Sequence, residues 1–111
     1  MQNIGLIGLG RMGARYKLAI DKNEHFNLSK ILKKKQKITN KKIYINKKKF
    51  FKKKDLIDAY IVASPIETHY DYIKEIIKIK KPLIVEKPIV KNADELLKFV
   101  NLTKKLKKYP L

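Results

Sequence analysis

The stretch NIGLIGLGRMG, residues 3–13, decides the fold of this chain. Its first half is short and almost continuously apolar, as in a strand that is buried on both faces. Three glycines follow at the spacing GxGxxG, and residues 14–22 then have the composition of a helix. A strand, a glycine-rich turn and a helix in this order predict the first unit of an α/β fold.

Each of the three glycines has its own expected role in such a turn. Gly8 permits the tight change of direction, Gly10 lets the backbone approach a pyrophosphate, and Gly13 lets the helix pack closely on the strand. The helix N-terminus adds unpaired N–H groups and a partial positive charge. The spacing therefore predicts dinucleotide binding, and the alternative is a glycine-rich turn that holds no ligand.

The rest of the chain alternates strands and helices. Further strands are predicted at residues 26–33, 43–45, 59–63 and 83–85, and further helices at residues 50–57, 68–78 and from 93 onward. Residues 34–42 are almost wholly polar and predict a loop or a stunted helix. Thr68 is the expected N-cap of its helix, and Asn92 with Glu95 predicts a capping box. Short apolar strands between helices indicate a Rossmann-like, mostly parallel sheet with helices on both faces.

Three of the predicted helices have an apolar face that we expect to point inward. The residues of these faces are Leu18 and Ala19 in the first helix, Tyr72, Ile73, Ile76 and Ile77 in the middle one, and Leu96, Leu97, Val100 and Leu106 in the last. At 111 residues the chain has the length of one ordinary domain with a modest core.

Lysine occupies the position that is expected to select the cofactor. In sites for NAD, an acidic residue about 20 positions after the last glycine binds the ribose 2′-hydroxyl. Here Lys33 and Lys34 stand at that point, and no acid occurs between Glu24 and Asp55. Lysines remove the repulsion of a 2′-phosphate and can pair with it, which favours NADP slightly over NAD. The alternative is that lysine merely filled a position of no importance.

The formal net charge is +18, from 28 basic and 10 acidic residues. Lysine accounts for 26 of the basic residues, and 13 of these lie within residues 30–54. Nonspecific adhesion to polyanions is therefore expected. Only Arg11 and Arg15 offer the bidentate contacts that nucleic-acid binders favour, and a bias toward A/T-rich codons is the expected main cause of the many lysines. A basic nucleic-acid-binding protein stays an alternative.

What the sequence lacks disfavours other classes of protein. There are no cysteines, which excludes disulfides and cysteine zinc sites, and we expect no metal. No apolar stretch approaches the ~20 residues of a membrane span, and no signal peptide precedes the glycine motif. We therefore expect a cytoplasmic protein with no membrane partner.

Three segments together resemble one family. They are IGLIGLGRMG at residues 4–13, DAYIVASPIETH at residues 58–69 and PLIVEKP at residues 82–88. In order and spacing they resemble the Gfo/Idh/MocA oxidoreductases, which include glucose–fructose oxidoreductase and inositol 2-dehydrogenase. The resemblance implies that the chain binds NAD or NADP. It also implies reversible hydride transfer between the nicotinamide and a sugar or cyclitol alcohol.

The resemblance implies roles for individual residues as well. Lys87 would be the catalytic residue, which faces cofactor and substrate and assists proton transfer. The glycines of the motif, with Lys33 and Lys34, are already candidates for cofactor binding. The resemblance adds further cofactor-binding residues, which are Leu9, Arg11, Met12, Ser64, Pro65, His69, Glu86 and Lys87. The residues from Ser64 onward would border the nicotinamide half of the cofactor.

The chain departs from this family in two respects. Residues 34–54 are shorter and richer in lysine than in the family pattern, which bears on the adenine side of the site. Family members carry a second, larger α+β domain that builds the substrate pocket, and nothing in this sequence resembles it. Residues 1–111 are therefore expected to form a truncated member, the NAD(P)-binding domain alone, whose protein partner would be a separately encoded substrate domain or a further copy of the chain in a homo-oligomer. We expect no turnover from this chain by itself. A non-functional gene fragment is the remaining alternative.

Overall fold

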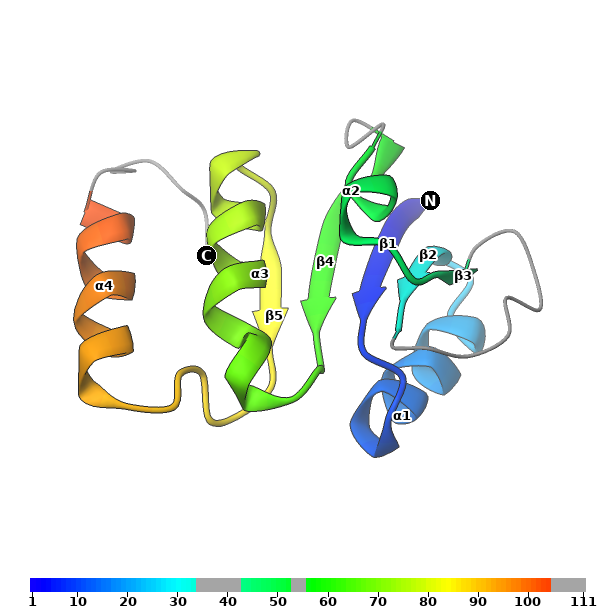
Figure 1. Ribbon diagram of the computed structural model, residues 1–111. Coiled ribbons are helices and arrows are strands. Elements are labelled where there is room, and N and C mark those ends of the chain that lie inside the picture. Colours follow the sequence, from blue (N-terminus) through cyan, green and yellow to red (C-terminus); the bar gives the residue numbers. More distant parts are fainter. Residues whose placement is uncertain (34–42, 53–55, 105–111) are drawn as a thin grey trace.

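The computed structural model describes residues 1–33, 43–52 and 56–104 (Figure 1). The predictions for Lys34, residues 34–42 and Leu106 lie outside these ranges. Within them, strands and helices alternate in the order β1 (Gln2–Ile7), α1 (Arg11–Asp21), β2 (Phe26–Leu32), β3 (Ile43–Tyr44), α2 (Lys47–Phe50), β4 (Ala59–Val62), α3 (Ile66–Lys78), β5 (Leu83–Val85) and α4 (Ala93–Lys104).

The described strands form one parallel sheet in the order β3-β2-β1-β4-β5. The chain builds one half of the sheet outward from β1 and then crosses to β4 on the other side of β1 (Figure 1). The strand order thus reverses between β1 and β4. Open α/β sheets bind ligands at such a point, beyond the carboxyl ends of the strands. The prediction of a Rossmann-like parallel sheet is confirmed.

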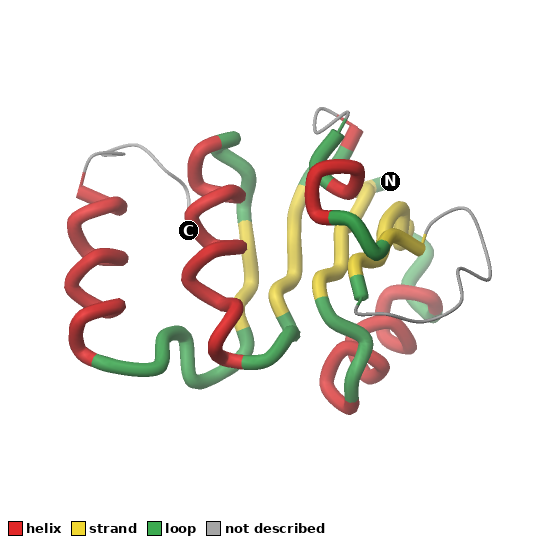
Figure 2. Tube along the Cα trace, in the orientation of Figure 1, coloured by secondary structure: helices red, strands yellow, loops and turns green. Residues whose placement is uncertain are grey.

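Two apolar cores, one on each face of the sheet, hold the helices in place. Figure 2 shows the helices lying on both sides of the strands. Side chains alternate along a strand, so Leu6 of β1 lies in one core and its neighbour Ile7 lies in the other. Ile20 brings α1 into the first core, whereas Phe50 and Ile76 bring α2 and α3 into the second. Each fully buried side chain of this size stabilises the fold by about 1.5–3 kcal/mol. The prediction of helices on both faces is confirmed.

Two helices begin earlier than the sequence predicts. α1 starts at Arg11 because the N–H of Ala14 already donates to the carbonyl oxygen of Gly10, at 2.9 Å. α3 has Pro65 as its N-cap, so the prediction of Thr68 in that role is wrong. The Thr68 hydroxyl instead donates to the Pro65 carbonyl oxygen at 2.6 Å, from within the first turn.

The short helix predicted at residues 50–57 lies elsewhere. Residues 47–50 form α2, and the side chain of Asn46 caps it by accepting from the N–H of Lys49 at 3.2 Å. Asparagine is a strong N-cap, and the buried Phe50 anchors the end of the helix. The run of lysines has no apolar periodicity, which is why the sequence did not indicate the boundary. Residues 53–55 lie outside the described ranges.

The apolar face predicted for α1 is wrong. Leu18 is 56% exposed and Ala19 is also exposed, whereas Gly13 and Ile20 are buried. The close contact of Gly13 with the preceding turn fixes which side of α1 faces the sheet. Residues three and four positions apart share one helix face, so Tyr16 follows Gly13 on that side.

The last helix also leaves its predicted apolar face uncovered. α4 lies beside α3 at one end of the described structure (Figure 1). In this position Leu96 is 51% exposed, Leu97 is 62% exposed, and Val100 is exposed as well, so the prediction that they point inward is wrong. The cap at Asn92 is confirmed, because its side chain accepts from the N–H of Glu95 at 2.9 Å. The face predicted for α3 is confirmed too, since Ile73, Ile76 and Ile77 are buried.

Candidate functional site

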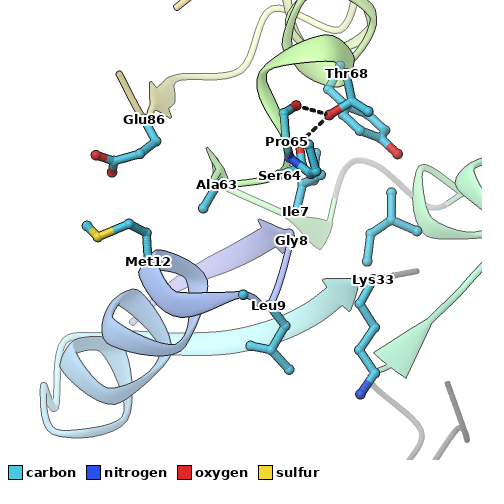
Figure 3. Close-up of a pocket in the computed structure, with 13 residues that line it drawn as sticks. Ile7, Gly8, Leu9, Met12, Lys33, Ala63, Ser64, Pro65, Thr68 and Glu86 are labelled. Atoms are coloured by element: carbon cyan, nitrogen blue, oxygen red, sulfur yellow. Dashed lines mark hydrogen bonds between the residues drawn. The ribbon is translucent and has the colours of Figure 1, made fainter. Parts of the chain in front are cut away.

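A pocket of about 510 Å³ lies beyond the carboxyl ends of the strands, where the strand order reverses (Figure 3). This volume is within the usual range for small-molecule sites. The described residues that line it are Ile7, Gly8, Leu9, Gly10, Met12, Leu32, Lys33, Ala63, Ser64, Pro65, Thr68, Tyr72 and Glu86. They come from the ends of four strands, from the turns that follow them, and from helices α1 and α3.

The turn after β1 is packed directly against the turn after β4. Gly8 has a φ of +94°, and a Cβ there would lie 2.6 Å from the backbone nitrogen of Ser64. A Cβ on Gly13 would overlap the carbonyl oxygen of Gly8. Both positions therefore require glycine for reasons internal to the fold. Their close approach places the start of α1 at the floor of the pocket.

Gly10 differs from the other two glycines of the motif. A Cβ built at Gly10 meets no atom within 4 Å, and its φ of −81° suits any residue. Nothing in the described structure therefore requires glycine at this position. Gly10 lines the pocket, and the space around its missing Cβ is open.

The N-terminus of α1 opens onto this space. No side chain caps it, and its first turn contains no acidic residue. The first N–H groups of a helix have no partner within the helix and carry a partial positive charge. A pyrophosphate could accept from these groups, and an enlarged side chain at Gly10 would stand in its way. The residues present thus fit a dinucleotide.

Lys33 and Glu86 lie at opposite ends of the pocket, with the glycine turn between them (Figure 3). Lys33 directly follows β2, and its backbone N–H donates to the carbonyl oxygen of Tyr44 at 2.9 Å. Glu86 follows β5, and its N–H donates to the carbonyl oxygen of Val62 at 2.9 Å. These two are the charged side chains among the described lining residues.

Tyr16 of α1 holds Glu86 across the pocket rim. The phenol of Tyr16 donates to Oε2 of Glu86 at 2.7 Å. This hydrogen bond to a carboxylate raises the pKa of the Tyr16 phenol above its usual value, and burial and the charge of Glu86 add to the effect. Sequence reasoning missed Tyr16, although its spacing of three residues from Gly13 places it on the inward face of α1.

His69 lies behind the pocket rather than in it. Its side chain is 2% exposed. Nε2 is 2.8 Å from the carbonyl oxygen of Ser64, and Nδ1 is 2.9 Å from that of Pro88 and 3.1 Å from that of Ile89. The ring thereby joins the turn after β4 to the loop that carries Lys87.

His69→Ala is expected to lower the free energy of unfolding by about 2–4 kcal/mol, because it removes a buried ring and leaves buried carbonyl groups unpaired. Urea unfolding measures the loss. The chain's other histidine, His25, is exposed and provides the control: His25→Ala should change stability by less than about 0.5 kcal/mol. Equal effects of the two substitutions would contradict this role for His69.

The structure brings together most, but not all, of the predicted site residues. Those that line the pocket are Gly8, Leu9, Gly10, Met12, Lys33, Ser64, Pro65 and Glu86. Those that do not line it are Arg11, Gly13, His69 and Lys87, and Lys34 lies outside the described ranges. Lys87 is exposed immediately beside Glu86. The lining residues that sequence reasoning missed are mostly apolar and stand at strand ends or in α3: Ile7, Leu32, Ala63, Thr68 and Tyr72.

Two further kinds of feature are absent from the described ranges. No helix there has the length and apolar character needed to cross a bilayer. Among the same residues, His, Asp and Glu side chains nowhere gather in a group of three that could hold a metal ion.

Solved structures of several oxidoreductases share this fold. A probable dehydrogenase from Thermotoga maritima superposes with a TM-score of 0.81 at 26% identity, over 95% of this chain and 34% of that one. D-galactose-1-dehydrogenase from Rhizobium etli gives a TM-score of 0.77 at 20% identity, over 93% and 34%. GenD2 from gentamicin A biosynthesis, solved in complex with NAD, gives 0.80 at 15% identity, over 94% and 32%.

The chain spans about a third of the length of these solved structures. No curated protein matches it. The family model described as an oxidoreductase family with an NAD-binding Rossmann fold matches residues 2–109. The match covers almost the whole chain and agrees with its parallel sheet and glycine turn, so this protein belongs to the Gfo/Idh/MocA oxidoreductases and corresponds to their NAD-binding domain.

Proposed function

We propose that this chain binds NAD(H) or NADP(H) in the pocket where the strand order reverses, with the pyrophosphate at the N-terminus of α1. The observation that carries the proposal is Gly10, which lines the pocket and at which an added Cβ would meet no atom within 4 Å, so the fold itself does not require glycine there. The uncapped start of α1, without an acidic residue in its first turn, supports the same ligand.

The residues divide into those that contact the cofactor and those that shape the site. Gly8, Leu9, Gly10 and Met12 line the turn that would cradle the phosphates, and Arg11 is exposed beside them. Ser64, Pro65 and Glu86 line the end of the pocket that would take the nicotinamide. Gly13 and His69 act indirectly in this proposal, because they hold the turns in place.

The reaction we propose is the family's hydride transfer between a nicotinamide and a sugar or cyclitol alcohol. The bound cofactor would supply the hydride chemistry. Lys87, exposed at the carboxyl end of β5, would assist proton transfer once a substrate lies against it. The protein partner of this chain would be a separately encoded substrate domain or a second copy of the chain in a homo-oligomer. Residues 1–111 alone are expected to bind cofactor without turnover.

Lys33 is the residue we propose for cofactor selection. It lies at the end of β2, where a ribose 2′-group is expected, and Lys34 follows it outside the described ranges. Lys33→Glu is expected to weaken NADPH binding by about tenfold and NADH binding much less, because it replaces a cation near the 2′-phosphate with an anion. Fluorescence titration with both cofactors gives the ratio of the two dissociation constants.

Lys98→Glu is the matched control for Lys33→Glu. Lys98 is exposed on α4, outside the pocket lining, and its substitution changes the net charge by the same amount. It should leave the ratio of dissociation constants unchanged. If both variants shift the ratio equally, general charge and not a site at Lys33 governs the preference.

The net charge of +18 favours a second candidate, which is nonspecific binding of polyanions. Titration with NADH at ~50 mM and ~300 mM salt separates the two candidates, because screening removes interactions between exposed charges. A built site predicts NADH binding that persists at the higher salt. Loss of NADH binding at the higher salt would overturn the proposed function in favour of simple charge attraction.

A further inference from the structure

We infer that Glu86, held by Tyr16, makes this site favour the oxidised cofactor, whose nicotinamide ring carries a positive charge, over the reduced cofactor, whose ring is neutral. The inference rests on the proposed function, since it concerns how the same pocket treats the two redox states. It is carried by the position of Glu86, by its hydrogen bond to Tyr16 and by the charges around it.

The position of Glu86 places its carboxylate at the nicotinamide half of the cofactor. Dinucleotides lie across the carboxyl ends of a Rossmann-like sheet, with the pyrophosphate at the first helix and the adenosine ribose at the end of the second strand. Lys33 marks that second-strand end here. Glu86 lies at the other end of the pocket, beyond the glycine turn (Figure 3). The nicotinamide ring, whose charge changes with the redox state, would therefore lie near the Glu86 carboxylate.

Within the described ranges, the Glu86 carboxylate has Tyr16 as a hydrogen-bond partner and no ion-pair partner. The ion pairs among the described residues are Lys17–Asp21 and Lys47–Glu75, and Glu86 is in neither. Lys33, the basic residue in the described lining, lies at the far end of the pocket. Lys87 follows Glu86 in the chain but does not line the pocket. The positive end of α1 attracts the phosphates in both redox states and therefore does not discriminate between them.

Tyr16 fixes the position of the Glu86 carboxylate. Its phenol donates to Oε2 of Glu86 at 2.7 Å and so restrains a carboxylate that is only partly buried. Tyr16 projects from α1, the helix that begins at the glycine turn, whereas Glu86 follows β5. The hydrogen bond thus joins the two flanks of the pocket. Tyr16 is accordingly a positioning residue that acts through Glu86.

The test compares the dissociation constants of NAD⁺ and NADH, with NAD⁺ measured by competition against bound NADH. Glu86→Gln keeps the shape of the side chain and removes its charge. It should weaken the binding of NAD⁺ relative to that of NADH by about three- to tenfold, as expected for one charge acting across a partly solvated pocket. Tyr16→Phe should shift the ratio in the same direction by a smaller factor, because the carboxylate remains but is no longer held.

Glu24→Gln provides the control, since Glu24 is exposed and does not line the pocket. It should leave the NAD⁺/NADH ratio unchanged. If wild-type chain binds both forms and Glu86→Gln leaves their ratio unchanged, the inference is wrong while the proposed function stands. If wild-type chain binds neither form, both fail. If Glu86→Gln does not fold, the NAD⁺/NADH ratio of dissociation constants in Tyr16→Phe decides the matter. An unchanged ratio overturns the inference, and a shift in favour of NADH binding supports it.

Discussion

Gly8→Ala is expected to lower the free energy of unfolding by about 2–5 kcal/mol, the sum of a left-handed backbone strain and a forced overlap. Gly8 has a φ of +94°, which alanine adopts only under strain. The new methyl group would also lie 2.7 Å from the carbonyl oxygen of Ala63 and 2.6 Å from the nitrogen of Ser64. These are backbone atoms of the neighbouring turn, which cannot rotate away as a flexible side chain could.

The loss is measured by urea unfolding followed by circular dichroism. Gly10→Ala is the matched control, because its methyl group enters open space from an ordinary φ. That control should lower the free energy of unfolding by only about 1 kcal/mol, the cost of a poorly capping residue at the N-cap of α1. The total free energy of unfolding of a domain of this size is only about 5–15 kcal/mol, so Gly8→Ala could leave little folded protein at 37 °C. Equal stability of the two variants would contradict the close packing of the two turns.

Gly10→Val is expected to weaken NADH and NADPH binding by a hundredfold or more while the domain stays folded. The branched side chain would fill the space in front of the first N–H groups of α1, where the pyrophosphate is proposed to lie. It would also replace glycine at the N-cap with a residue that caps poorly, at a cost of about 1 kcal/mol. Fluorescence titration measures the binding, and urea unfolding confirms that the fold survives.

A graded series sharpens this second prediction. Gly10→Ala places a single methyl group at the pocket and should weaken binding less than Gly10→Val does. For each variant, the loss of affinity relative to wild type should be the same at low and high salt, because it arises from blocked space and not from charge. Unchanged affinity in Gly10→Val would place the phosphates away from the start of α1 and so contradict the proposed site.

Much of the fold was predictable because its signals are local. Strands β1, β4 and β5 are short apolar runs, and the spacing of Gly8, Gly10 and Gly13 identifies the turn at which the sheet receives a ligand. The helix boundaries were less predictable. Ala14 was expected to begin the first helix, but backbone hydrogen bonding to Gly10 extends the helix back into the motif.

The features that the sequence does not predict depend on contacts between distant segments. The exposed face of α4, with Leu96 and Leu97, looks like a core face in sequence, because periodicity does not reveal what lies opposite. Tyr16 and Glu86 are 70 positions apart, so only the folded sheet brings them together. His69 was expected at the cofactor, yet its ring nitrogens face backbone carbonyls of two loops. Those loops are separate in the sequence, and only the folded chain brings them to the two sides of the ring.

The most direct test of the central claim, that the glycine turn holds the dinucleotide, is an NMR titration of the ¹⁵N-labelled chain with NADH at ~300 mM salt. The four glycines of the chain serve as built-in probes. The amides of Gly8, Gly10 and Gly13 should shift strongly, whereas Gly5, buried under the ring of Tyr60, should shift little. Glycine amides that do not move at saturating NADH, or shifts confined to lysine-rich segments, would contradict the claim.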